Sequence, residues 1–146
     1  MIVSQAGRQG QQGFTLIELM LVVVIIAIIS AVAVPMYGEQ VRRSSRNEAR
    51  SIMMENQLWM EQRMTVNSTY LNNNVAPVLP YTQSPKAGRA KYRMTLTNVT
   101  AGTYTLSAIP EQGVDDKCKT FVIDQTGLRS LSGSPTLSVE ECWNGK

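Results

Sequence analysis

The sequence predicts an α+β fold, in which one long N-terminal α-helix packs on a small antiparallel β-sheet. Three observations support this prediction: a continuous apolar run near the N-terminus, an amphipathic stretch directly after it, and alternating apolar and polar residues in the C-terminal third. A chain of 146 residues has room for one modest domain beside such a helix.

The apolar run extends from Phe14 to Val34 and contains a single charge, Glu18. As a helix it covers roughly 30 Å, the thickness of the hydrocarbon core of a bilayer. A secretory signal peptide has a shorter apolar run and a cleavage site beyond it, so it does not fit. A plain transmembrane anchor does not account for Glu18. We therefore expect residues 14–35 to span lipid at one stage and to pack against protein at another.

Residues 36–64 are predicted to continue the helix as an amphipathic half. This stretch is rich in strong helix formers, and its apolar residues recur at helical spacing. They are Val41, Ala49, Ile52, Met53, Trp59 and Met60. Pro35 removes one backbone hydrogen bond, and Gly38 adds conformational freedom, so both are predicted to weaken the helix between its halves.

An irregular connection is predicted for residues 65–90, which are rich in Asn and Pro. The period then becomes two, and strands are expected at 92–97, 104–110 and 120–124 within a sheet region of residues 91–127. Short links between them favour antiparallel pairing, with one face covering the helix around Ile52 and Trp59. The tail from Leu128 onward is expected to be irregular.

Two cysteines, Cys118 and Cys142, stand near the C-terminus. If this part of the chain is exported, they predict one disulfide closing residues 118–142, which would stabilise the fold by roughly 3 kcal/mol. Two reduced, buried thiols are the alternative.

Composition argues against an enzyme. The chain has no histidine, no nucleophile with a base beside it and no cluster of metal ligands. We therefore expect no catalytic residue, no metal, no cofactor and no small-molecule substrate. The net charge of +3 is too weak to indicate a nucleic-acid binder by itself.

The residues Gly13-Phe14-Thr15-Leu16-Ile17-Glu18 resemble the class III signal of type IV pilins and related pseudopilins. The resemblance implies a type IV pilin fold and cleavage by a prepilin peptidase after Gly13, which removes a leader of residues 1–13. It also implies methylation of the new terminus at Phe14. Glu18 would pair with that terminus on a neighbouring subunit; a solvated Glu18 near the membrane surface is the alternative reading.

The same resemblance implies a location and a set of partners. Before assembly the chain would cross the inner membrane once with its N-terminus in the cytoplasm, and residues 36–146 would form a periplasmic domain. The chain would then enter an extracellular pilus. Its partners would be other pilin subunits, the inner-membrane assembly machinery, the prepilin peptidase and the membrane itself.

Two basic stretches are candidates for contact with DNA or with a partner. One lies in an i, i+4 row after the apolar run, and the other surrounds Tyr92. Their residues are Arg42, Arg46, Arg50, Lys86, Arg89, Lys91 and Arg93. Lipid headgroups, solvent, acidic residues of adjacent subunits or DNA could face them. The positive-inside rule would place the first row in the cytoplasm, but we favour the pilin topology because long domains are exported regardless of charge.

Within the pilin family, residues 41–50, 118–127 and 141–143 resemble PilE-type minor pilins. That group lies near the ComP-type minor pilins, DNA-uptake receptors that carry an additional disulfide, which two cysteines cannot supply. We therefore expect a minor pilin that supports pilus assembly, twitching motility, adhesion or DNA uptake. A major pilin, a type II secretion pseudopilin and a DNA-binding receptor module remain the alternatives.

Overall fold

One helix, α1 (Leu16–Asn67), dominates the N-terminal half of the chain in the computed structural model, which describes residues 14–145. The structure divides within this helix into two compact units, Met1–Gly38 and Glu39–Lys146. The predicted leader, and with it Gly13 of the proposed cleavage site, lies outside the described residues.

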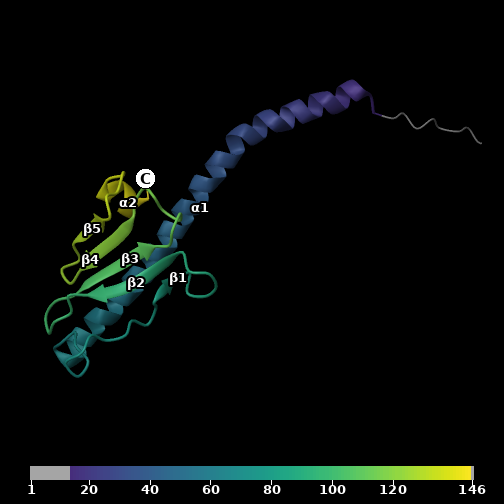
Figure 1. Ribbon diagram of the computed structural model, residues 1–146. Coiled ribbons are helices and arrows are strands. Elements are labelled where there is room, and N and C mark those ends of the chain that lie inside the picture. The colour runs from purple at the N-terminus through teal and green to yellow at the C-terminus, as the bar shows by residue number, and fades with distance from the viewer. Residues whose placement is uncertain (1–13, 146) are drawn as a thin grey trace, which may run out of the picture. The chain divides into compact units, whose positions relative to one another are not determined.

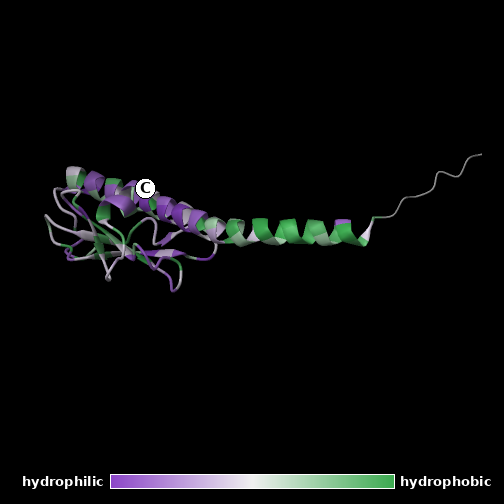
Figure 2. Cartoon of the chain, turned by 90° about the horizontal axis from the view of Figure 1, so that it is seen from above, coloured by the Kyte–Doolittle hydropathy of each residue, from purple (hydrophilic) through white to green (hydrophobic). Residues whose placement is uncertain are grey.

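The part of the first unit that the structure describes is mainly an apolar helix with exposed side chains. Its most apolar window has a mean hydropathy of 3.0 and none of it is buried, so by length and composition it can cross a membrane. Figure 2 shows this apolar stretch giving way to a more polar second half of α1. The helix continues through Pro35 and Gly38, so neither residue ends it, and it extends to Asn67, three residues beyond the predicted end at Met64.

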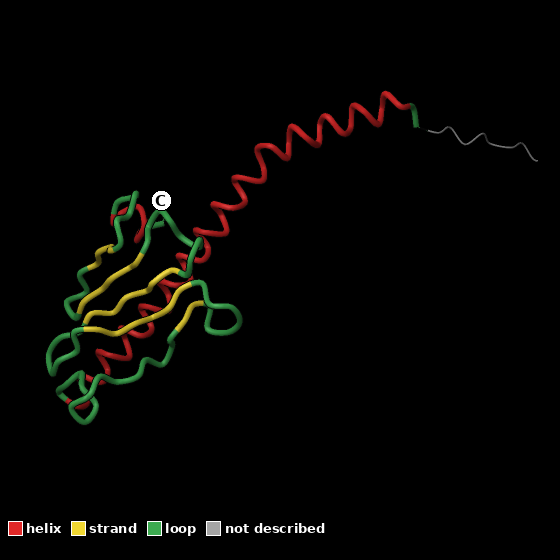
Figure 3. Tube along the Cα trace, viewed as in Figure 1, coloured by secondary structure: helices red, strands yellow, loops and turns green. Residues whose placement is uncertain are grey.

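The second unit contains a five-stranded sheet in which every neighbouring pair is antiparallel, in the order β1-β2-β3-β4-β5. Figures 1 and 3 show the strands side by side, with the second half of α1 crossing one face. The strands are β1 (Gln83–Ser84), β2 (Tyr92–Thr97), β3 (Thr105–Pro110), β4 (Thr120–Asp124) and β5 (Arg129–Ser132). The predicted fold class is confirmed.

Two parts of the secondary-structure prediction were wrong. β1 lies inside the predicted irregular connection, and β5 and a short helix, α2 (Val139–Asn144), lie in the predicted irregular tail. β1 has two residues, too few to show an alternating pattern, and β5 alternates little because only one of its four residues is apolar. These elements form through pairing with their neighbours, which the local sequence does not reveal.

The core lies between α1 and the sheet. From the helix, Ala49, Ile52, Met53 and Met60 are buried, as the apolar spacing predicted. Trp59 is only partly buried at the edge of this cluster. The sheet and loops contribute Tyr70, Leu79, Tyr92, Met94, Tyr104, Leu106, Ala108, Phe121 and Ile123.

A disulfide joins Cys118, just before β4, to Cys142 in α2, with 5.8 Å between their Cα atoms. Both cysteines are buried. The start of α2 is stabilised by a capping box, in which Ser138 and Glu141 satisfy each other's backbone N–H groups. The C-terminal segment is therefore attached to the sheet by a covalent bond and by a helix.

Candidate functional site

Glu18 lies in the first turn of α1, where it forms a capping box with Thr15. One carboxylate oxygen of Glu18 accepts a hydrogen bond from the backbone N–H of Thr15 (2.9 Å) and one from its hydroxyl (2.8 Å). The hydroxyl oxygen in turn accepts from the backbone N–H of Glu18 at 3.3 Å. The carboxylate is exposed, so it retains acceptor capacity for a further donor.

Arg46, a predicted contact residue, is part of a buried network instead. Its side chain donates two hydrogen bonds of 2.7 Å to Asp115. The same carboxylate accepts a hydrogen bond of 2.8 Å from the hydroxyl of Tyr92. Arg46 is 6% exposed and Asp115 is 2% exposed. The prediction that Arg46 contacts DNA or a partner is therefore wrong, because its charge is buried and already paired.

The same network controls the protonation of Asp115. Burial alone would raise the pKa of this carboxyl, but the hydrogen bonds from Arg46, from the backbone of Cys118 and from Tyr92 lower its pKa below the ordinary value. Burial beside this carboxylate raises the pKa of Tyr92. At neutral pH the network thus contains an ionised acid, a charged guanidinium and a neutral phenol.

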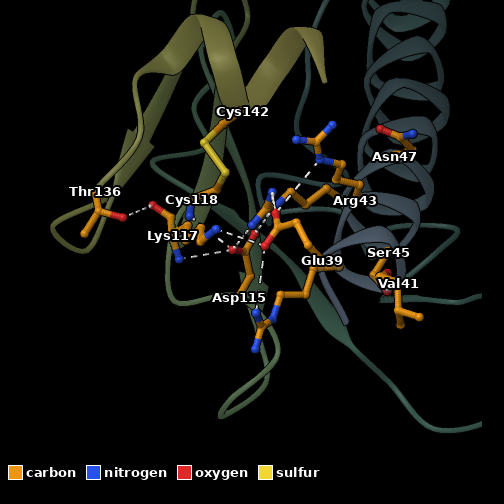
Figure 4. A network of polar contacts seen from close by, with 12 residues as sticks. Glu39, Val41, Arg43, Ser45, Asn47, Asp115, Lys117, Cys118, Thr136 and Cys142 are labelled. Carbon is orange, nitrogen blue, oxygen red and sulfur yellow. Dashed lines mark hydrogen bonds and ion pairs between the residues drawn. A yellow bond between two sulfur atoms is a disulfide. The ribbon is translucent and has the colours of Figure 1, made fainter. Parts of the chain in front are cut away.

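Glu39 lies beside this network and forms ion pairs with four cations, of which Figure 4 labels Arg43 and Lys117. Its carboxylate is 3.0 Å from Lys117 and 3.3 Å from Arg46, with Arg42 at 3.8 Å and Arg43 at 4.0 Å. The hydrogen bond from Lys117 lowers the pKa of Glu39, although partial burial opposes it. Because three exposed cations share this carboxylate, the start of the domain is positively charged.

Arg50, the third residue of the predicted row, stabilises the end of α2. It donates to the backbone carbonyl oxygens of Cys142 (3.3 Å) and Trp143, and to the side-chain oxygen of Asn47. A cation is favoured at the carbonyl end of a helix. Of the predicted row, only Arg42 is thus exposed without a structural role of this kind.

The second basic stretch forms the loop between β1 and β2 and the start of β2. Within it, Lys86 pairs with Glu55 at 2.6 Å, and Arg93 pairs with Glu111. Lys91 donates to the hydroxyl of Ser45 at 3.0 Å. Two of the four cations therefore already have an acidic partner.

Arg89 lies exposed in this loop and has no ion pair among residues 14–145. The side chain of Gln83 donates to the carbonyl oxygens of Pro85 and Gly88 (3.1 Å each), which holds the loop in shape. Gly88 has φ +84°, a conformation that favours glycine. Figure 1 shows the loop extending beyond the ends of β1 and β2.

A polar hollow of about 390 Å³ adjoins the loop. Its lining residues are Arg89, Ala90, Arg93, Glu111 and Gln112. Two guanidinium groups and one carboxylate face a space of this size, which is enough for a phosphate group. The part of the chain that the structure describes contains no group of three His, Cys, Asp or Glu residues suited to a metal ion.

Sequence reasoning missed Asp115 and Lys117 as members of these charged clusters. The pairing of Glu39 with Arg42 and Arg43 follows from the sequence, because Glu39 precedes them by about one helical turn. Asp115 and Lys117 come from the β3–β4 loop, and no spacing rule relates them to α1.

Two family models match the chain. A model described as "Type IV minor pilin ComP, DNA uptake sequence receptor" matches residues 35–122, and one described as "Prokaryotic N-terminal methylation motif" matches residues 8–34. The first covers more than half of the chain and includes most of the core residues and the loop between β1 and β2.

Curated relatives match this chain over part of its length. Fimbrial protein EcpC of Eikenella corrodens is 55% identical over 42 residues, which are 29% of this chain and 28% of that protein. Type IV major pilin protein PilE of Neisseria gonorrhoeae is 40% identical over 67 residues, 46% of this chain and 36% of that protein. The chain therefore spans only 28% and 36% of the length of these two relatives.

Two similar solved structures are also pilins. The non-core minor pilin PilV of Neisseria meningitidis has a TM-score of 0.47 at 21% identity, over 65% of this chain and 90% of that one. A type IV pilin from Shewanella oneidensis has a TM-score of 0.46 at 20% identity, over 64% of this chain and 94% of that one.

The first family model represents the ComP group. The resemblances seen in the sequence alone place this group near the PilE-type minor pilins. Both cysteines of the chain are used in one disulfide, so this match does not depend on a second one. The prediction of a type IV minor pilin is confirmed. The chain belongs to the type IV pilin family, as a member of the group described as type IV minor pilin ComP.

Proposed function

We propose that this pilus subunit binds duplex DNA through the loop between β1 and β2 and takes part in DNA uptake. The observation that carries this proposal is the match of residues 35–122 to a family described as a DNA uptake sequence receptor, because that range contains the whole loop. DNA binding, weighed at first as an alternative to a general minor pilin, thereby becomes the leading function.

The chemistry of the loop supports this proposal. Arg89 and Lys91 have no carboxylate partner among the described residues, and Arg93 lines the hollow beside them. Phosphate oxygens need only positively charged donors within reach, and most contacts between proteins and DNA are of this kind. Since the chain carries a net charge of only +3, the local arrangement of cations must supply the attraction.

The test uses the full chain in a non-ionic detergent and a labelled 20-base-pair duplex, with binding followed by fluorescence anisotropy over a salt series. Each lost phosphate contact should reduce the slope of log K against log salt by about 0.9. Arg89→Ala combined with Lys91→Ala should therefore weaken binding and flatten the slope. Lys119→Ala, which removes a cation paired with Asp116, is the matched control. Equal binding by the double variant and the wild type would reject the loop as the interface.

The N-terminal part of the chain supports a second part of the proposal, concerning membrane insertion and assembly. Cleavage after Gly13 and methylation of Phe14 would leave residues 14–35 across the inner membrane with the N-terminus in the cytoplasm. The match of residues 8–34 to the methylation motif and the exposed apolar helix support this. In the filament, Glu18 would meet the terminal amine of a neighbour, and Pro35 and Gly38, next to the boundary between the two units, would let the helix adjust.

Mass spectrometry of sheared pili tests this part. The mature subunit should begin with N-methylated Phe14, and its copy number relative to the most abundant subunit should be low, as expected of a minor pilin. A subunit that still begins at Met1 would contradict processing, and a subunit that dominates the pilus would indicate a major pilin.

A further inference from the structure

A second hollow, of about 250 Å³, lies between α1, β5 and α2, away from the β1–β2 loop. Its lining residues are Asn47, Arg50, Ser51, Met54, Arg129 and Trp143. This lining contains two guanidinium groups and no carboxylate. The polar hollow beside the β1–β2 loop contains Glu111, and the hollow beside Tyr81 contains Glu55, so neither has this excess of positive charge.

The two cations of this hollow lie close enough to repel each other. Burial lowers the pKa of Arg50, and the positive charge of Arg129 lowers it further. Neither guanidinium forms an ion pair with any residue from 14 to 145. An anion placed between them would relieve this repulsion and would be attracted by both charges.

The remaining polar side chains of the hollow can donate hydrogen bonds. The side-chain oxygen of Asn47 accepts from Arg50, so its NH₂ group is left without a partner among the described residues. The exposed hydroxyl of Ser51 and the buried Nε of Arg50 also have no partner in that part of the chain. A set of several donors without an acidic acceptor suits a phosphate group, whose oxygens only accept.

Trp143 positions one of these donors. Its indole N–H donates to the carbonyl oxygen of Ser130 at 3.1 Å, and its ring packs edge-on against Phe121 with 5.3 Å between centroids. Trp143 is 5% exposed, so its ring is fixed. The guanidinium carbon of Arg129 lies 5.2 Å from the centroid of that ring. Cation–π attraction in this arrangement holds the planar guanidinium and leaves its N–H groups for an anion.

We propose that this hollow is an anion site that binds a backbone phosphate of DNA, with Arg129 as the main ligand and Asn47 and Ser51 as further donors, while the positive charge of Arg50 attracts the anion. The proposal rests on the proposed DNA-binding function and adds a second contact to it. Arg129 belongs to β5 and the loop of Arg89 follows β1, so the two contacts lie at opposite edges of the sheet. A substitution can therefore remove either of these two DNA contacts and leave the other intact.

The experiment again uses the full chain in non-ionic detergent, with two probes. Inorganic phosphate is compared with chloride at equal ionic strength, and the readout is the unfolding temperature, which rises when an anion binds the folded state. The 20-base-pair duplex is titrated over a salt series. The variants are Arg129→Ala, Asn47→Asp, which adds a carboxylate to the hollow and keeps Arg129, and Lys119→Ala as control.

Arg129→Ala and Asn47→Asp should each abolish the phosphate-dependent rise, and Arg129→Ala should weaken duplex binding about tenfold and reduce its salt slope by about 0.9. The control should match the wild type in both assays. An unchanged phosphate effect and salt slope in both variants would overturn the anion site, even if loss of Arg89 showed that the β1–β2 loop binds DNA. A wild type that binds phosphate at Arg129 but no duplex would overturn the DNA assignment and the proposed function, and would leave a phosphate site.

Discussion

Arg46 and Asp115 form a doubly hydrogen-bonded ion pair in the interior of the domain, although 69 positions separate them in the sequence. The pair connects the amphipathic half of α1 to the β3–β4 loop, three residues before the disulfide-bonded Cys118. Tyr92 and the backbone N–H groups of Lys117 and Cys118 complete the hydrogen bonds to the carboxylate.

Removing one partner of this pair should be strongly destabilising. Arg46→Ala leaves a buried carboxylate without its cation, which typically costs about 3–5 kcal/mol of unfolding free energy. The measurement is urea unfolding of the full chain in detergent, followed by tryptophan fluorescence. Glu111→Gln, which breaks the exposed pair with Arg93, serves as the control and should change stability by less than about 1 kcal/mol. Similar losses in the two variants would contradict the structural role of the buried pair.

Acid should destabilise the domain through the same carboxylate. The pKa of Asp115 is lowered below 3.8 in the folded state, so the unfolded chain binds this proton first as the pH falls. The stabilisation from Asp115 is therefore fully present above about pH 5, and it is lost as the pH decreases through 3.8 and then through the lower folded-state pKa. Unfolding temperatures measured from pH 7 to pH 2.5 should show this loss.

Asp115→Asn provides the comparison for this pH dependence. The variant is less stable at neutral pH, and its stability should decrease less steeply below pH 5 than that of the wild type. Part of the decrease should remain, because the pKa of Glu39 is also lowered, mainly by Lys117. Identical slopes in the two proteins would show that Asp115 does not control acid stability.

The disulfide should supply a comparable part of the stability. Cys118 and Cys142 are separated by 24 positions, and a loop of this length contributes about 3 kcal/mol in the chain-entropy treatment. The double variant Cys118→Ser and Cys142→Ser should lose about this much in urea unfolding. Reducing agent should destabilise the wild type and leave the double variant unchanged. If reducing agent, added while the wild type is unfolded, left its free energy of unfolding unchanged, this result would argue against the bond.

Assembly should depend on the charge of Glu18. Glu18→Gln keeps the size and an acceptor oxygen but removes the charge that would meet a neighbour's terminal amine, so incorporation into pili should fall at least tenfold. The amount of subunit in sheared pili, relative to that in the membrane, measures this. Met20→Leu, a change on the same exposed apolar segment, should leave incorporation unaltered. Normal incorporation of the glutamine variant would reject the pairing of Glu18.

The sequence predicted well those features that arise from local periodicity. The helical spacing of Ile52, Met53 and Met60 identified the buried face of α1, and the period of two identified β2, β3 and β4. The two cysteines allowed only one pairing. β1 and β5 escaped prediction because such short strands are stabilised by their neighbours in the sheet rather than by their own pattern.

The sequence by itself determined that this chain has an apolar helix with one acid near its start, a helix-and-sheet domain and the signature of a pilin. Only the tertiary structure decided which basic residues are available to a ligand. Arg42, Arg46 and Arg50 share one helical row, yet Arg46 is neutralised by Asp115 and Arg50 is used to stabilise α2. A cation's availability depends on the acids and carbonyl groups that distant segments bring to it, and residue spacing along one helix does not contain that information.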